Sequence, residues 1–170
     1  MQFPVDDCRN SKLETENRKL KTMPVTVKAT VGQMPYATRL ETPGHAWIVD
    51  EPADVGGGDT GPRPGELLAA SLASCTAITL RMYVDRKGWR VDEIAVEATV
   101  ERDAEANRTT FRCRVAATGD LTDEQRARLL HIAKACPVHK MLTNPVEIHT
   151  ELVDAPTALE TFSPSTSPSP

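Results

Sequence analysis

The most reactive side chains in this sequence are four cysteines, and Cys75 stands in the longest weakly charged stretch of the chain. Its neighbours Ala73, Ser74, Thr76 and Ala77 are all small, which leaves space beside the sulfur for a substrate. A thiolate in such a place is a nucleophile. The alternative interpretation is that Cys75 is a buried cysteine serving as a small core residue.

Cys136 is the second candidate, because it immediately precedes Pro137. The residue before a proline avoids the helical conformation, so Cys136 is expected at the N-cap of a short helix that Pro137 begins. Unpaired backbone N–H groups at such a position favour a thiolate. His139, Lys134 and Lys140 add positive character nearby. The alternative is a core residue that ends the preceding helix.

The other two cysteines are expected to be less reactive. Cys113 is in phase with Phe111 and Val115 on a predicted strand, so the pattern predicts a core residue. Cys8 lies in a polar N-terminal stretch and has no predicted role.

A thiol-ligated metal site is a rival use of the same side chains. Cys136 and His139 form one pair of candidate ligands, separated by Pro137 and Val138. Further ligands would come from Cys75, His131, His45 or His149. The sequence has no second paired motif, so the spacing indicates a metal site only weakly.

The element that must position Cys75 is a predicted helix from Pro64 to Gly88. Pro64 suits the first helical position, and Gly88 suits the residue just past the last one. No charge occurs from Leu67 to Leu80, and apolar or small residues occupy every face, which is typical of a buried helix. Hydroxyl residues interrupt the stretch, so it is not expected to span a membrane. They are Ser71, Ser74, Thr76 and Thr79.

Strand patterns flank this helix on both sides. Residues 24–33 and 36–52 alternate at strand period, with Pro43 and Gly44 as a turn. The loop 50–65 is rich in Gly and Pro but lacks the Gly-Lys-Ser/Thr ending of a phosphate-binding loop. The patterns of residues 91–103 and 109–118 predict two more strands, with one face of the sheet buried and the other exposed to solvent.

A second helix is predicted from Thr122, which forms a capping box with Gln125, to Cys136. A short helix from Pro137 and a last strand over 144–154 complete the order. Antiparallel pairs with few βαβ units predict an α+β fold. One sheet covers only one side of the long helix, so burial alone favours a homodimer.

The 170 residues predict one domain with ragged ends, at a net charge of −4. We expect an extension over 1–23, a single domain over 24–154 and a disordered tail over 155–170, with Met23 as a possible true start. The mixed charges give no case for nucleic acid or a membrane surface as partner. The first residues lack the apolar run of a signal peptide, so a cytoplasmic protein with free thiols is expected.

Two stretches together resemble the OsmC/Ohr family of hydroperoxide-reducing and stress-related proteins. They are GPRPGELLAASLASCTAITLRMYVDRKG and LTDEQRARLLHIAKACPVHKML. The preceding DEPADVGGGDTGP resembles the OsmC-like branch in particular. The resemblance covers about residues 24–153. It implies an intertwined α+β homodimer, with antiparallel sheets around a long central buried helix and two active sites at the subunit interface.

The resemblance also implies a reaction. Cys75 would be the peroxidatic nucleophile toward a small organic peroxide, and Cys136 the resolving cysteine. An external dithiol of lipoyl type would reopen their disulfide, and no metal or flavin cofactor is required. Glu66, with Arg63 or Arg39, would tune the site, although Glu66 is displaced by one position and neither arginine matches the family pattern clearly. The alternative is a protein of this fold that binds a small apolar ligand without efficient peroxidase activity.

Overall fold

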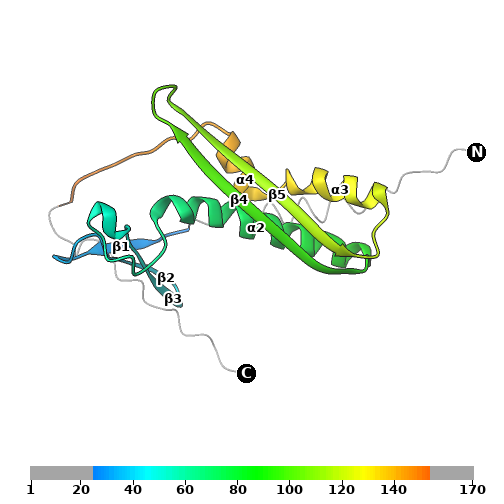
Figure 1. Cartoon of the computed structure of the whole chain (residues 1–170), viewed down its shortest axis with the longest axis horizontal. Helices are drawn as coiled ribbons and strands as arrows, with labels where there is room; N and C mark the ends of the chain where they lie inside the picture. Colours follow the sequence, from blue (N-terminus) through cyan, green and yellow to red (C-terminus); the bar gives the residue numbers. More distant parts are fainter. Residues whose placement is uncertain (1–24, 154–170) are drawn as a thin grey trace, which may run out of the picture.

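The computed structural model describes residues 25–153. The predicted extension 1–23, with Cys8 and Met23, and the predicted tail 155–170 lie outside the described residues. Within the described part, a small sheet, a long helix, a long hairpin and two shorter helices follow one another along the chain (Figure 1). This is the α+β architecture with antiparallel sheets that the sequence predicts.

The first sheet is an antiparallel meander of β1 (Lys28–Val31), β2 (Thr38–Thr42) and β3 (His45–Val49). Pro43 and Gly44 form the predicted turn between β2 and β3, and Gly44 has a φ of 82° that glycine adopts without steric cost. The sheet lies beside the N-terminal end of the long helix (Figure 1).

The long helix α2 (Pro64–Lys87) has the predicted bounds, with Gly88 in the left-handed conformation as its C-cap. Its buried residues are Leu72, Thr76, Leu80 and Val84. Their spacing of four places them in one stripe along the helix. Leu68, Ile78 and Met82 are 51%, 60% and 56% exposed. The expectation of burial on every face is therefore wrong within a single chain, because the chain folds its other elements over one side of α2 only.

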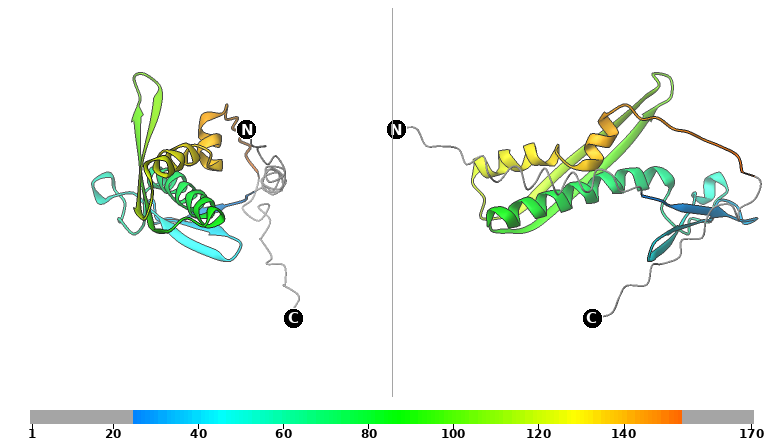
Figure 2. Two further views of the ribbon diagram at one scale, coloured as in Figure 1. Left: turned by 90° about the vertical axis from the view of Figure 1, so that its right-hand side faces the viewer. Right: turned by 180° about the vertical axis from the view of Figure 1, so that it is seen from behind.

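The second sheet is a long hairpin of β4 (Val91–Asp103) and β5 (Arg108–Gly119), which packs along α2 (Figures 1 and 2). Ile94 and Val96 lie on its inner face and contact a buried cluster that includes Leu80, Val84 and Leu129. The predicted buried and solvent-exposed faces are confirmed along β4, where half-buried and exposed residues alternate.

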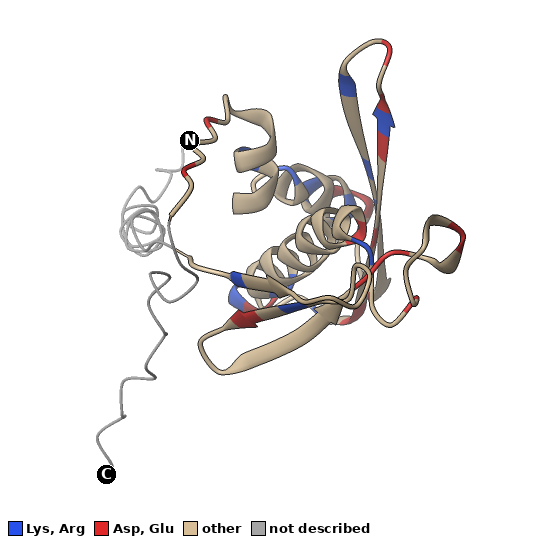
Figure 3. Cartoon of the chain, turned by 90° about the vertical axis from the view of Figure 1, so that its left-hand side faces the viewer, with Lys and Arg blue, Asp and Glu red and all other residues tan. Residues whose placement is uncertain are grey.

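The hairpin carries charged residues of both signs along its length (Figure 3). Arg114 pairs with Glu97 at 3.2 Å, and Arg112 pairs with Glu101 on the neighbouring strand. Opposite charges that face each other across strands offset one another. This ribbon therefore presents no continuous basic surface.

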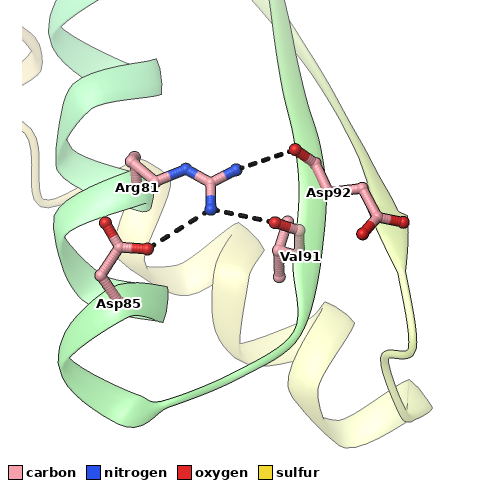
Figure 4. A network of polar contacts seen from close by, with 4 residues as sticks. All are labelled: Arg81, Asp85, Val91 and Asp92. Carbon is pink, nitrogen blue, oxygen red and sulfur yellow. Dashed lines mark hydrogen bonds and ion pairs between the residues drawn. The ribbon is translucent and has the colours of Figure 1, made fainter.

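Arg81 fastens the last turns of α2 to the start of β4 (Figure 4). Its guanidinium donates to the carbonyl oxygens of Val91 and Asp92 at 3.0 and 3.3 Å and pairs with Asp85 at 3.4 Å. The contact fixes how the hairpin leaves the helix, because both carbonyls belong to the first two residues of β4.

Two shorter helices, α3 (Asp123–Ala133) and α4 (Pro137–Thr143), pack against α2 (Figure 2). The predicted capping box is confirmed: Gln125 N–H donates to Thr122 Oγ1 at 3.3 Å, and Thr122 N–H donates to Gln125 Oε1 at 2.9 Å. Cys136 is the N-cap of α4, as its place before Pro137 predicts.

The predicted last strand is absent from the described chain, where residues 144–153 have no regular structure. Val146, Ile148 and Leu152 in this segment are 67%, 84% and 99% exposed. A strand needs a neighbouring strand for its backbone hydrogen bonds, and no described strand pairs with this segment.

By length and composition, α2 is long and apolar enough to cross a membrane, with a mean hydropathy of 1.5 over its most apolar window. The four hydroxyl residues therefore do not by themselves lower the hydropathy of the stretch below that of a membrane span. The leucines and alanines between the hydroxyl residues keep the average high. The core helix of a soluble protein has the same properties, and α2 packs against β4, α3 and α4.

Candidate active site

The middle of α2 and the start of α4 meet at two cysteines. Cys136 is fully buried. Its sulfur accepts a hydrogen bond from the His139 backbone N–H at 3.2 Å, which is the capping contact of α4, and one from the Thr76 hydroxyl at 3.5 Å. The short helix therefore holds Cys136 against the buried stripe of α2.

Cys75 lies beside this group and is partly buried. Burial raises the pKa of the Cys75 thiol above its ordinary value, and its hydrogen bond with Cys136 acts in the same direction. The Val138 backbone N–H and the Thr79 hydroxyl oppose this rise by bonding to the sulfur. The fold thus brings the two thiols near one another from positions far apart in the sequence, at the N-terminus of α4.

The structure corrects the expectation that Cys113 is a core residue. Cys113 is on the inner face of β5, opposite Ala98 in β4, as its phase with Phe111 predicts, yet it is exposed. The reason is that Cys113 lines a cavity between β5 and the helices, which leaves its side chain accessible. Partial burial raises the pKa of the Cys113 thiol, and the Thr76 hydroxyl lowers it again through a hydrogen bond.

This cavity has a volume of about 380 Å³. Its walls combine apolar side chains with a few polar groups, among them Leu72, Thr76, Phe111, Cys113, Lys134 and His139. A small pocket with mostly apolar walls and a few polar groups is the usual form of a small-molecule site. Lys134 and His139, singled out in the sequence as positive groups near Cys136, thus line the cavity.

The structure does not bring Arg63 and Glu66 to Cys75 within one chain. Both belong to the N-terminal cap of α2, where Arg63 N–H donates to Glu66 Oε2 at 2.9 Å and the side chains pair at 3.6 Å. Cys75 follows Glu66 by nine residues, which is about 13 Å along a helix.

Arg39 is also held elsewhere. It lies on β2 and pairs with Glu41 at 3.1 Å, with half of its side chain exposed. The roles of the two arginines and of Glu66 at the thiol stay predictions, and the described chain alone places no arginine among the groups that set the pKa of Cys75.

Sequence reasoning missed the residue that shapes the loop before α2. The Asp50 side chain is buried, and one of its oxygens accepts from the Glu51 N–H at 2.8 Å. The other accepts from the N–H groups of Gly58 and Thr60 at 3.1 Å and from the Thr60 hydroxyl at 2.8 Å. The Thr60 hydroxyl, together with these N–H groups, holds the pKa of Asp50 below its ordinary value against the opposing effect of burial.

Two glycines let the loop fold tightly around Asp50. A Cβ on Gly57 would lie 1.8 Å from the Glu51 carbonyl oxygen, and one on Gly61 would lie 2.2 Å from the Ile48 carbonyl oxygen. No larger residue fits at either position without moving the backbone. The signal in the sequence was an aspartate followed by a glycine-rich run and a threonine ten residues on, and the loop sets the place where α2 begins.

Among residues 25–153, no three His, Cys, Asp or Glu side chains lie close enough together to hold a metal ion. The candidate ligands His45, His131 and His149 therefore do not join Cys136 and His139 in a site. His149 instead faces Glu147 at 3.8 Å.

The sequence model of a family described as OsmC-like protein matches residues 56–151. The chain belongs to this family. The matched stretch contains Cys75, Cys113 and Cys136 together with Arg63 and Glu66, whereas Arg39 precedes it. The paired cysteine motifs and the cavity are therefore part of the OsmC-like domain.

Solved structures of OsmC-like and related proteins share this fold. A protein from Psychrobacter arcticus, described as a putative osmotic stress induced and detoxification response protein, has a TM-score of 0.61 at 24% identity, over 71% of this chain and 89% of that one. A putative organic hydroperoxide resistance protein from Vibrio cholerae, with captopril bound in one of its active sites, has a TM-score of 0.55 at 22% identity, over 72% and 85%. The organic hydroperoxide resistance protein OhrB of Bacillus subtilis has a TM-score of 0.52 at 23% identity, over 71% and 91%. No curated protein matches this chain.

Proposed function

We propose that this protein reduces organic hydroperoxides with the thiols of Cys75 and Cys136. The nearness of these two thiols carries the proposal: Cys75 directly precedes Thr76, whose hydroxyl lies 3.5 Å from the Cys136 sulfur, and Cys136 raises the pKa of Cys75. Attack by one thiol and resolution by another needs two neighbouring cysteines. The hydroperoxide-resistance proteins of the same fold from Vibrio cholerae and Bacillus subtilis support the substrate class.

The chemistry follows from the positions of the sulfurs. The Cys75 thiolate attacks the outer oxygen of the peroxide, the O–O bond breaks, and the leaving alkoxide takes a proton to become an alcohol. Cys75 is then a sulfenic acid. The Cys136 thiol attacks its sulfur, a disulfide forms, and the hydroxyl group leaves with a proton as water.

An external dithiol completes the cycle in this proposal. It reduces the disulfide in two exchange steps and becomes a disulfide itself. A lipoyl-type dithiol is the expected reductant, and the expected compartment is the cytoplasm, where such thiols stay reduced. No metal or flavin takes part in these steps.

The proposal includes a homodimer. In the single chain the pKa of Cys75 is raised and no arginine is among the groups that affect it, so a second chain would have to supply the cation. A guanidinium near the sulfur would favour the thiolate and stabilise the leaving oxygen. A second copy, packed on the exposed apolar face of α2, would bring its own Arg39 or Arg63 close to Cys75. The exposure of Leu68, Ile78 and Met82 supports this arrangement.

The test is peroxide consumption by the full chain. Cumene hydroperoxide is mixed with the protein and excess dihydrolipoamide, and the remaining peroxide is measured over time. We expect turnover by the wild type, near-complete loss of turnover in Cys75→Ser, and no loss in Cys8→Ser. Equal rates for wild type and Cys75→Ser would refute the mechanism.

The second candidate function is the binding of a small apolar ligand in the cavity, which its largely apolar walls support. Intact-mass measurement after peroxide treatment separates the two functions. Loss of two hydrogens that depends on both Cys75 and Cys136 supports the peroxidase. Unchanged thiols, with a small molecule that copurifies and is released on denaturation, support the binding protein.

A further inference from the structure

We propose that Thr76 is a catalytic residue for the reduction of the Cys75–Cys136 disulfide, because its hydroxyl donates to the Cys136 sulfur as that sulfur leaves as a thiolate. The inference rests on the proposed function, since this disulfide must first form. The family match gives Thr76 no role, and its sequence pattern predicts only a small neighbour of Cys75.

Thr76 is the polar member of an otherwise apolar stripe. It is 1% exposed, and the other buried residues of α2 are Leu72, Leu80 and Val84. A buried hydroxyl that lacks a hydrogen-bond partner costs free energy. The partner of this one is the Cys136 sulfur at 3.5 Å. The stripe therefore carries a hydroxyl at the position where it meets the fully buried thiol.

A second donor reaches the same sulfur. The His139 backbone N–H donates to Cys136 Sγ at 3.2 Å. A thiolate has no proton to donate, so it can only accept from the hydroxyl and from this N–H. The structure contains Cys136 as a free thiol, which is the product of the leaving step. Both donors are therefore already in place where the negative charge arrives.

Access decides which sulfur the reductant attacks. Cys136 is fully buried, whereas Cys75 is partly accessible and must be reached by the peroxide in the proposed cycle. The reductant therefore attacks Cys75, and Cys136 is the leaving group. Exchange is faster when the leaving thiolate is better stabilised. Thr76 supplies that stabilisation from within the protein.

The two exchanges balance with the dithiol as the reductant. Its first thiolate attacks the Cys75 sulfur, a mixed disulfide forms, the Cys75–Cys136 bond breaks, and Cys136 takes the electron pair as a thiolate. The second thiolate of the dithiol then closes the disulfide of the reductant and releases Cys75 as a thiolate. Two electrons pass from the dithiol to the protein, and the two protons of the dithiol pass through solvent to the cysteines.

Reduction of a preformed disulfide tests Thr76 apart from peroxide chemistry. The parent protein is the full chain with Cys8→Ser and Cys113→Ala, which leaves Cys75 and Cys136 as its thiols and removes the second sulfur that bonds to the Thr76 hydroxyl. Diamide oxidises the parent without a peroxide step, and peptide mapping identifies the bond formed. Dithiothreitol is added in excess, samples are quenched with acid and N-ethylmaleimide, and intact mass follows the return of thiols.

We expect Thr76→Val in this parent to be reduced roughly two- to tenfold more slowly, the effect of one hydrogen bond. Thr76→Ser is the matched control, because it loses the methyl group but keeps the hydroxyl, and it should be reduced at the parent rate. Circular dichroism checks that both variants are folded, and Thr76→Ala replaces the valine variant if that one is not.

Three results would overturn the inference. They are a valine variant as fast as the parent, a serine variant as slow as the valine variant, and a parent in which diamide forms no Cys75–Cys136 bond.

Mixed-disulfide mapping checks the direction of attack. The monothiol 2-mercaptoethanol replaces dithiothreitol, so the reaction pauses after the first exchange, and N-ethylmaleimide then alkylates the released thiol. We expect the mercaptoethanol adduct on Cys75 and the alkyl group on Cys136. The reverse pattern would show that Cys75 is the leaving group and would overturn the role of Thr76.

Consumption of cumene hydroperoxide separates this inference from the function on which it rests. If peroxide is not consumed while the valine variant slows reduction of the diamide-formed disulfide, the peroxidase proposal fails and the role of Thr76 in exchange stands. If peroxide is consumed and the valine variant is reduced at the parent rate, the peroxidase proposal stands and the inference fails.

Discussion

At Cys75, burial and the neighbouring Cys136 act on the pKa in the opposite direction to two hydrogen bonds. Burial disfavours the thiolate, whereas the Val138 N–H and the Thr79 hydroxyl favour it. The net direction in the single chain is a raised pKa, so the thiol is mostly protonated near neutral pH. Reactivity should therefore rise with pH, because only the thiolate attacks.

Replacing Thr79 by valine should slow the reaction of Cys75 with iodoacetamide. Valine keeps the shape of the side chain but removes the hydroxyl that bonds to the sulfur, so the pKa rises further and less thiolate is present at pH 8. The expected reduction in rate is roughly two- to tenfold, the effect of one hydrogen bond. Peptide mass spectrometry follows alkylation at Cys75 alone. Thr79→Ser should restore the rate, and a valine variant as fast as the wild type would contradict the assignment.

Asp50 should make stability depend on pH on the acid side. Its pKa is lowered in the folded protein, so its contribution is present above the unfolded pKa and is lost as pH falls through the folded value. Asp50→Asn should lower the free energy of unfolding at pH 7, because an NH2 group replaces one of two oxygens that both accept from backbone N–H groups. The difference from wild type should shrink below about pH 4. Urea unfolding at both pH values measures it, and an equal difference at both would refute the role.

At the scale of elements, the stripe of α2 has more effect on stability than its exposed faces. Leu80 is fully buried and packs with Val84 and Leu129. Leu80→Ala should lower the free energy of unfolding by about 2–5 kcal/mol. Glu105→Ala, on the exposed hairpin tip, should change it by less than about 0.5 kcal/mol. Urea unfolding of the two variants and the wild type checks this ranking, and equal stabilities would contradict the packing described.

Local signals explain why most elements could be predicted. Pro64 and Gly88 mark the ends of α2, Thr122 with Gln125 begins α3, and the residue before Pro137 is an N-cap. Each of these signals depends only on neighbours within a few positions, so the sequence alone reveals it. The strand alternation of β4 is equally local. The cavity beside Cys113 was missed because it depends on how β5 and three helices meet.

Contacts between distant segments set the rest. Cys75 and Cys136 were both singled out, but some sixty residues of chain separate them and no spacing rule places them near one another. The segment 144–153 has the pattern of a strand, yet a strand also requires a partner edge, which the described chain does not offer it. The buried contacts of Asp50 depend on a loop that returns over its own start.

At the scale of the whole molecule, two apolar surfaces of the described chain are exposed to solvent. One is the exposed apolar face of α2, and the other is the extended segment with Val146, Ile148 and Leu152 exposed. Burying apolar surface contributes about 25 cal/mol for each Å² removed from water. A second copy that covers both features would gain this stabilisation and would enclose Cys75 at the interface.

An aspartate on the exposed face of α2 should separate the copies and reduce peroxidase turnover together. In Ile78→Asp, a charge would be buried at the proposed interface without a partner, which disfavours association. Light scattering after size exclusion should give twice the chain mass for wild type and one chain mass for this variant. Turnover of cumene hydroperoxide should fall, because Cys75 would lose the guanidinium that the second copy supplies in the proposed dimer. Ala95→Asp, on the exposed face of β4, is the matched control and should stay dimeric. A wild type of single-chain mass, or a fully active monomeric variant, would show that one chain makes the whole site.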